Sequence, residues 1–229
     1  MKIFDPDYWS RSMRDPLVLA GLVVDLAPIY AVLAWGWGAG ALVGLYWIEN
    51  VIIGAATLPR IFVSAARQGV TGVLGGAFLG AFFTVHYGMF CFVHGVFVMS
   101  FFAMSSGAGG EAFPDGPLEL IGRATGMAPH MLLMALLLAA WQAVLLVWEF
   151  GVKGGWRTSN PNEEMMAPYG RIVVLHVGIF AGAAALIFVG DPMIGVLGLI
   201  LLRALWGVWT RSRLSRKAAD ELSVEAAAS

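Results

Sequence analysis

Four histidines are the residues of this sequence that are best suited to chemistry. They are His86, His94, His130 and His176, and they are all the histidines in the chain. Each lies in a segment apolar enough to be predicted as a membrane-spanning helix. Ionisable side chains are costly in hydrocarbon, and by default they mark functional sites. The sequence therefore points to imidazole chemistry: metal ligation, haem ligation or hydrogen bonding within a helix bundle.

His86 and His94 belong to one dense motif, eight residues apart. On a helix this spacing corresponds to about 80° of rotation and about 12 Å of rise. The two imidazoles are expected broadly on one side of the helix but at different depths, so they cannot ligate one metal ion together. Each histidine therefore needs a partner from another helix.

Depth along the predicted helices suggests which residues meet. Glu49 and His176 are expected near mid-membrane with His86, whereas His130 is expected toward the outer side, level with His94. The prediction is a metal site of Glu49, His86 and His176, and a possible second site of His94 and His130. Four further residues are expected to support these sites: Tyr46, Asn50, Asp25 and Arg171.

Three interpretations of the middle cluster compete. Two imidazoles and a carboxylate suit zinc, iron or copper. A histidine from each of two spans could instead hold a haem, although levels about 12 Å apart are tight for two stacked macrocycles. The third interpretation is structural, with each histidine hydrogen-bonded to a neighbour. No dense ligand motif such as His-Glu-x-x-His is present, which places the structural interpretation of the histidines ahead of metal and haem. No phosphate loop or nucleophile elbow is present either. As the function we predict a metal-binding membrane protein; the alternatives are a b-type cytochrome-like electron carrier and a non-catalytic structural or assembly subunit.

The composition indicates a membrane protein. Of the 229 residues, 59% are apolar and 13% are charged, whereas a soluble domain carries about 25% charged residues. The apolar residues form separate blocks close to the roughly 20 residues that a transmembrane helix needs. We predict an all-α, polytopic transmembrane helix bundle of about six spans. The spans are expected at 17–35, 41–58, 71–103, 127–150, 168–189 and 193–209.

The predicted six-helix domain covers 17–210. It follows an interfacial N-terminal arm (1–16) and precedes a cytoplasmic tail (211–229) that is basic and then polar. The arm lacks a short apolar region followed by a small-residue cleavage site, so we expect no cleaved signal peptide. Lys and Arg concentrate in the arm, the tail and the connections after the second and fourth spans. This distribution predicts that both termini are cytoplasmic.

Five small residues recur every four positions along the third span: Gly72, Gly76, Gly80, Thr84 and Gly88. This spacing lets helix backbones approach closely. Packing within the chain is the favoured interpretation, and a homodimer seam is the alternative. The expected partners are the lipid bilayer and either other membrane subunits or a second copy. The net charge of −1 gives no indication of nucleic-acid binding.

Two motifs carry a resemblance: Tyr-Trp-x-Glu-Asn at residues 46–50 and His-Tyr-Gly-x-Phe-x-x-x-His at residues 86–94. With them the chain resembles a bacterial multi-pass inner-membrane protein family of unknown function. The resemblance covers most of the chain, up to about residue 210. It implies a bacterial inner-membrane location and a helical multi-pass fold, and it implies no activity.

Overall fold

The computed structural model describes residues 15–106 and 113–189, together with seven positions between 198 and 208. The predicted N-terminal arm up to residue 14, the predicted tail and most of the predicted sixth span lie outside the described residues. Within the described part, all regular structure is helical.

The described helices are bounded as follows: α2 (Pro16–Trp35), α3 (Ala39–Ala66), α4 (Gly69–Ser106), α5 (Pro117–Thr125), α6 (Met131–Val144), the π-helix η2 (Leu145–Val152), the 3-10 turn η3 (Gly155–Arg157) and α7 (Pro161–Val189). By length and composition, four helical segments among the described residues could cross a membrane: Pro16–Trp35, Ala39–Ala66, Gly69–Ser100 and Met131–Val152. The all-α prediction is thus confirmed and four helical segments are able to span a membrane, whereas the count of six spans stays a prediction.

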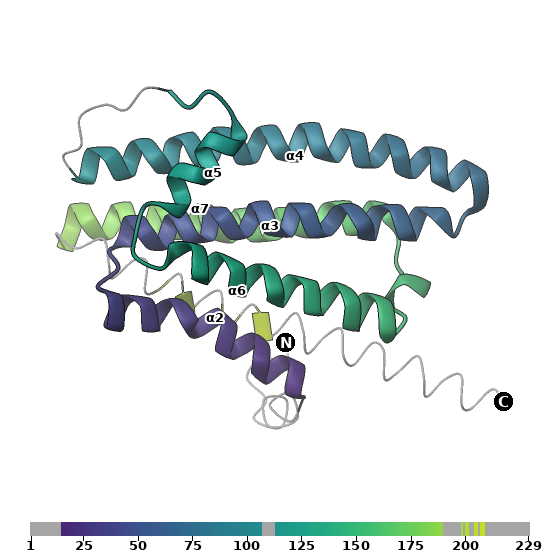
Figure 1. The fold of residues 1–229 in the computed structure, drawn as a ribbon, viewed down its shortest axis with the longest axis horizontal. Coiled ribbons are helices and arrows are strands. Elements are labelled where there is room, and N and C mark those ends of the chain that lie inside the picture. Colours follow the sequence, from purple (N-terminus) through teal and green to yellow (C-terminus); the bar gives the residue numbers. More distant parts are fainter. Residues whose placement is uncertain are drawn as a thin grey trace.

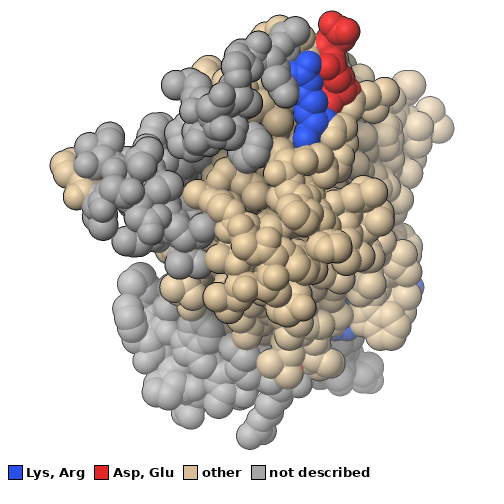
Figure 2. All heavy atoms as spheres, turned by 60° about the vertical axis from the view of Figure 1, so that its left-hand side comes forward, with Lys and Arg blue, Asp and Glu red and all other residues tan. Residues whose placement is uncertain are grey.

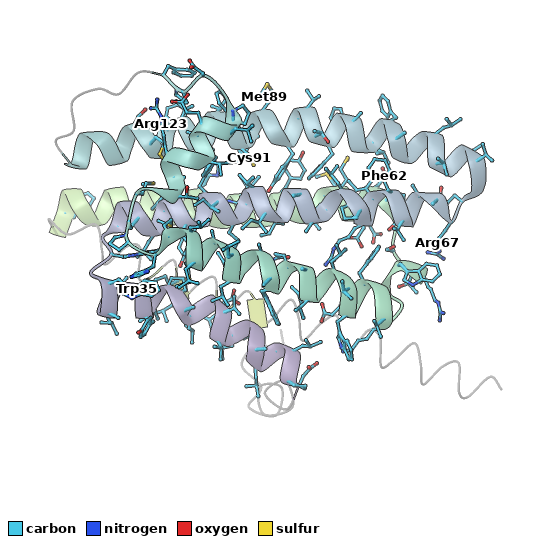
Figure 3. All side chains as sticks on the ribbon, viewed as in Figure 1. Trp35, Phe62, Arg67, Met89, Cys91 and Arg123 are labelled. Carbon is cyan, nitrogen blue, oxygen red and sulfur yellow. The ribbon has the colours of Figure 1, made fainter. Side chains whose placement is uncertain are left out.

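The long helices run back and forth along one axis (Figure 1). α3 lies between α4 and α6, and α7 runs beside α3. Trp35 and Arg67 mark the two opposite ends of the bundle (Figure 3). We call these the Trp35 end, where α5 packs, and the Arg67 end, where η3 lies.

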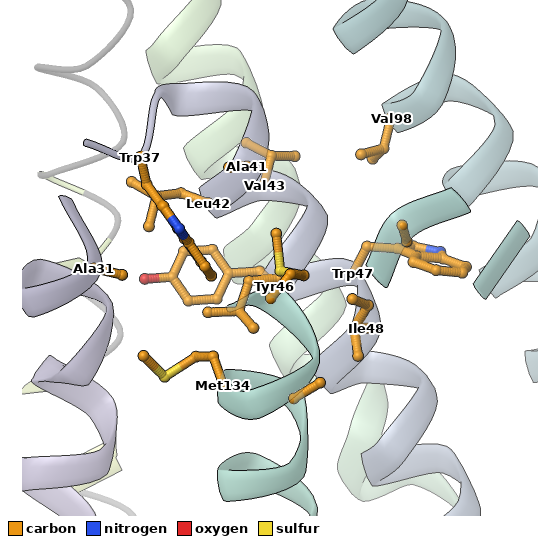
Figure 4. Close-up of a cluster of buried hydrophobic side chains, with 14 of the residues drawn as sticks. Ala31, Trp37, Ala41, Leu42, Val43, Tyr46, Trp47, Ile48, Val98 and Met134 are labelled. Atoms are coloured by element: carbon orange, nitrogen blue, oxygen red, sulfur yellow. The ribbon is translucent and has the colours of Figure 1, made fainter. Parts of the chain in front are cut away.

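The core is densest around the first half of α3. Tyr46 and Trp47 are 4% and 2% exposed, and Met134 of α6 and Ala31 of α2 pack in the same cluster (Figure 4). Trp37, in the turn before α3, is buried there and donates its indole N–H to the carbonyl of Pro129. α3 is therefore the central helix, and its polar residues face other helices.

The small-residue repeat on α4 forms the seam with α3. A Cβ built on Gly76 would lie 2.6 Å from Ala65 Cβ, and one on Gly80 would lie 2.6 Å from Phe62 Cζ. A Cβ on Gly88, in contrast, would meet open space. The favoured interpretation, packing within the chain, is confirmed for Gly76 and Gly80.

Three predicted helix boundaries were wrong. The second span was expected to stop at residue 58, but α3 continues through Pro59 to Ala66 because Ile61 and Ala65 are buried beyond the proline. That burial offsets the cost of a proline inside a helix, about 3 kcal/mol. α7 begins at Pro161, not at 168. The fourth span begins at Met131 rather than 127.

The segment between the predicted third and fourth spans contains a helix that the sequence pattern did not predict. α5 buries Leu120 and Ala124, both 0% exposed. Gly95 of α4 makes room for it, since a Cβ there would meet Leu120 and the Trp47 ring at 2.5–2.6 Å. α5 therefore packs across the side of the bundle, against α4 and α3, in the half that contains Trp35 (Figure 1). Among the described residues on the face shown in Figure 2, charged side chains are few.

Candidate functional site

His94 of α4 and His176 of α7 contact each other in the half of the bundle that contains the Trp35 end. The ring centroids of His94 and His176 are 4.4 Å apart and the rings are inclined by 70°. Both side chains are half-buried. This is the only direct histidine–histidine ring contact among the described residues, and it was not predicted, because His176 was expected to join His86.

One of these rings has a fixed tautomer. His176 Nδ1 lies 2.8 Å from the carbonyl oxygen of Ile172. A carbonyl can only accept, so Nδ1 carries a proton and, in the neutral ring, Nε2 carries the lone pair. Metal-ligating histidines are commonly oriented by such a hydrogen bond from the other ring nitrogen. His176 is therefore arranged so that Nε2 can act as a ligand atom.

His94 lines a small cavity whose walls are largely apolar. The cavity measures about 10 Å³, close to the minimum that holds one water molecule. Its walls come from three helices: Trp47, Asn50, Phe90, Cys91, His94 and Ile172. The Trp47 indole N–H donates to the Cys91 carbonyl at 2.7 Å, and the Tyr87 hydroxyl donates to the Asn50 carbonyl at 3.0 Å. These bonds fix α3 against the part of α4 that carries His94.

His86 lies two turns away and has a different partner. Its Nδ1 is 2.9 Å from the Tyr169 hydroxyl, and its ring stacks on Phe82 at 5.3 Å. His86 is exposed on the chain surface rather than buried. His86 was predicted to face the bundle interior as a metal ligand, but in the structure its side chain faces outward.

His130 is placed outside the spanning helices. It precedes α6 in a left-handed conformation with φ of 60°, and its ring lies 4.8 Å from that of Trp35. The predicted His94–His130 site is therefore replaced by two separate contacts, His94 with His176 and His130 with Trp35.

The predicted carboxylate ligand is buried but is not grouped with the predicted histidines. Glu49 is 5% exposed and Asp25 is 3% exposed. Among the described residues, no group of three or more His, Cys, Asp or Glu side chains is close enough to hold a metal ion. The structure thus does not bring Glu49, His86 and His176 together. Tyr46 and Asn50 are buried on α3, and the side chain of Arg171 lies outside the described residues.

A sequence model of one protein family matches residues 7–225, and its description is a family of unknown function, DUF6498. The chain belongs to the DUF6498 family. No curated protein and no solved structure matches it. The expectation of a family of unknown function is confirmed, and the bacterial origin stays a prediction.

Tyr169 is the site residue of this DUF6498 chain that the sequence analysis missed. It precedes His176 by seven residues on α7, a spacing that returns to nearly the same helix face. A tyrosine and a histidine on one face of a predicted span would have been a sufficient signal. The predicted span, 168–189, contains both residues, but the prediction paired His176 with His86 and gave Tyr169 no role.

Proposed function

We propose that this DUF6498 chain is a multi-pass protein of the bacterial inner membrane that binds a transition-metal ion through His94 and His176. The single observation that carries the proposal is the contact between their rings, 4.4 Å between centroids. Imidazole nitrogen suits zinc, copper and iron. The ligand set thus moves from Glu49, His86 and His176 to a histidine pair on α4 and α7.

The separation of the two rings fits ligation of one ion. With metal–nitrogen distances of about 2.0–2.1 Å, two imidazoles on one ion have centroids roughly 4.5 Å apart at a right angle and roughly 5 Å apart at a tetrahedral angle. The observed 4.4 Å needs only a small adjustment. The hydrogen bond from His176 Nδ1 to Ile172 supports the same role, because it leaves Nε2 for the metal. Further ligands would be water or a bound substrate.

The same geometry disfavours haem. Two axial imidazoles lie on opposite faces of the macrocycle, so their centroids are separated by roughly 6 Å, with the porphyrin between them. The rings of His94 and His176 contact each other directly. A cytochrome-like carrier would need these helices to separate. A structural or assembly subunit, in which the pair only joins α4 to α7, is the competing outcome of the test below.

The charge distribution supports a membrane orientation. At the Arg67 end, the Arg67 guanidinium donates to the Trp156 carbonyl at 2.9 Å, and Arg157 lies over the Trp156 ring. Arginine and tryptophan together are typical of a membrane interface, and excess Arg marks the cytoplasmic side. We therefore place the Arg67 end in the cytoplasm and the His94–His176 pair in the outer half of the bilayer.

The test is a metal titration of detergent-purified, metal-stripped protein. With Zn²⁺ we expect one ion per chain, and His94→Ala and His176→Ala should each weaken binding at least about tenfold. His130→Ala is the matched control, since it removes an imidazole from the same end of the bundle, and should bind as the wild type does. Equal, weak binding by all four proteins would overturn the proposal and favour the structural role. A Soret band in the purified protein would favour the cytochrome-like alternative.

A further inference from the structure

His86 is a histidine that lies on the outside of the bundle. His86 lies near the middle of the segment Gly69–Ser100, which is apolar and long enough to span a membrane, and its side chain is exposed. Polar side chains at this depth almost always face the bundle interior or a water-filled cavity. If α4 spans the bilayer as proposed above, something other than lipid tails must cover this imidazole.

The imidazole is held in a fixed orientation. Its Nδ1 is hydrogen-bonded to the Tyr169 hydroxyl at 2.9 Å. Tyr169 packs edge-on against the buried Tyr87 at 5.6 Å, and Tyr87 donates to the Asn50 carbonyl. A chain of contacts therefore runs from the central helix α3 to the surface. Because Nδ1 is engaged, Nε2 is the nitrogen that can reach a ligand from the membrane side, and the described residues show no bond to it.

The surface around His86 is apolar. The Phe82 ring is stacked nearly parallel to the imidazole, with an interplanar angle of 10° and a centroid separation of 5.3 Å. Four exposed apolar side chains line the same stretch of α4: Phe82, Val85, Met89 and Phe90. Charged residues are lacking among them. The stretch thus combines aromatic faces for stacking, one imidazole nitrogen, one phenol and no charge.

We infer that the His86–Tyr169 pair binds a lipid-soluble planar carbonyl compound of the quinone type, which enters from the bilayer. A planar ring can stack on aromatic side chains, and a ring carbonyl can accept a hydrogen bond from an imidazole N–H. A lipid tail offers no group for Nε2, and a charged headgroup would pay a large desolvation cost at this depth. The inference concerns binding only. It rests on the proposed membrane placement and not on the proposed metal site.

The experiment uses full-length protein in lipid nanodiscs and measures quenching of tryptophan fluorescence by decylubiquinone. Decanol, which has a tail but no ring, corrects for partition into the lipid. We expect saturable quenching by the wild type. His86→Phe removes the hydrogen bond to the ring carbonyl, and loss of one hydrogen bond corresponds to roughly tenfold weaker binding. Tyr169→Phe removes the hydrogen bond that orients the imidazole and should weaken binding in the same direction. His130→Phe, which alters an exposed histidine outside the spans, should leave the quenching curve unchanged.

Two results would overturn the inference. One is non-saturable quenching that is the same in the wild type and in His86→Phe. The other is loss of a dimer in His86→Phe without any change in quinone binding, which would show that a second copy covers the imidazole. The metal content of the same samples separates this test from the proposed function, because His86→Phe should keep the ion bound by His94 and His176. A chain recovered without detergent in the soluble fraction would instead contradict the membrane placement itself.

Discussion

The His94 imidazole of α4 contacts the His176 imidazole of α7, with 4.4 Å between ring centroids and an angle of 70° between ring planes. The Phe90 ring lies 5.7 Å from His94 and 5.9 Å from His176, so both imidazoles pack against one aromatic side chain. Phe90 also lines the small cavity beside His94, so the histidine pair packs against an aromatic wall. This arrangement restricts how far either ring can turn, and it is the physical basis of the proposed metal site.

Trp47→Phe should destabilise the bundle near the histidine pair. The substitution removes the hydrogen bond from the indole to the Cys91 carbonyl and leaves space beside Gly95. We expect the free energy of unfolding to fall by about 1–3 kcal/mol, as measured by denaturant unfolding in detergent. Trp148→Phe is the matched control, because Trp148 is 50% exposed. Equal losses of unfolding free energy in the two variants would show that the Trp47 hydrogen bond does not stabilise the bundle.

Two adjacent glycines of α4 should respond oppositely to alanine. A Cβ on Gly76 would lie 2.6 Å from Ala65 Cβ, whereas a Cβ on Gly75 would meet nothing within 4 Å. Gly76→Ala should therefore lower the melting temperature, by the equivalent of about 1–3 kcal/mol. Gly75→Ala should be neutral or stabilising by up to about 1 kcal/mol, because alanine favours helix. A melting temperature lowered equally by both substitutions would contradict the described α3–α4 seam.

The first turn of α5 should loosen in acid. Glu119 accepts the Asp115 backbone N–H at 2.6 Å and pairs with the Arg123 guanidinium, and these contacts, in that order, lower the pKa of Glu119 below its usual value. A carboxyl with a lowered folded pKa stabilises the fold above the unfolded value, about 4.3. The contribution is lost as the pH falls through the lower folded value. The protection of the α5 amides against hydrogen exchange, relative to their intrinsic exchange rate at the same pH, should therefore fall in that range, and in Glu119→Gln this protection should be low and insensitive to pH there.

The proposed orientation can be tested with single cysteines, because the chain has one natural cysteine, Cys91, which is 7% exposed. Thr158 lies in the connection at the Arg67 end and Phe113 lies just before α5, and both positions are exposed. The two variants are Thr158→Cys and Phe113→Cys. In intact cells, a membrane-impermeant maleimide should label position 113 and not position 158. The reverse pattern would place the Arg67 end outside.

The residue types of the site could be predicted from the sequence, but their pairing could not. The pairing depended on aligning helices by counting from their expected ends. α7, however, begins well along α4: Asn160 and Pro161 line a cleft together with Gly76 and Leu79. His176 is therefore level with His94, and Tyr169, seven residues earlier, is level with His86. Because α7 begins about two turns earlier than predicted, His176 pairs with His94 and not with His86.

The start of α7 is marked by a signal in the sequence. Asn160 caps the helix by accepting the backbone N–H of Asn162 at 2.9 Å, Pro161 occupies the first turn, and Glu163 and Glu164 follow. An asparagine, a proline and then acidic residues are typical of a helix N-terminus. The exposure of His86 had no comparable signal, because both faces of α4 are apolar and the sequence pattern does not distinguish the side that faces α3 from the side that faces outward.

The most direct test of the histidine pair is a count of the imidazoles around a bound ion. X-ray absorption at the zinc edge of the Zn²⁺-loaded wild type should show two imidazole ligands at about 2.0 Å. His176→Ala should show one, and His86→Ala should still show two. If the wild type has no imidazole ligand, or if His86→Ala loses one while His176→Ala does not, the account of His94 and His176 as the metal ligands is contradicted.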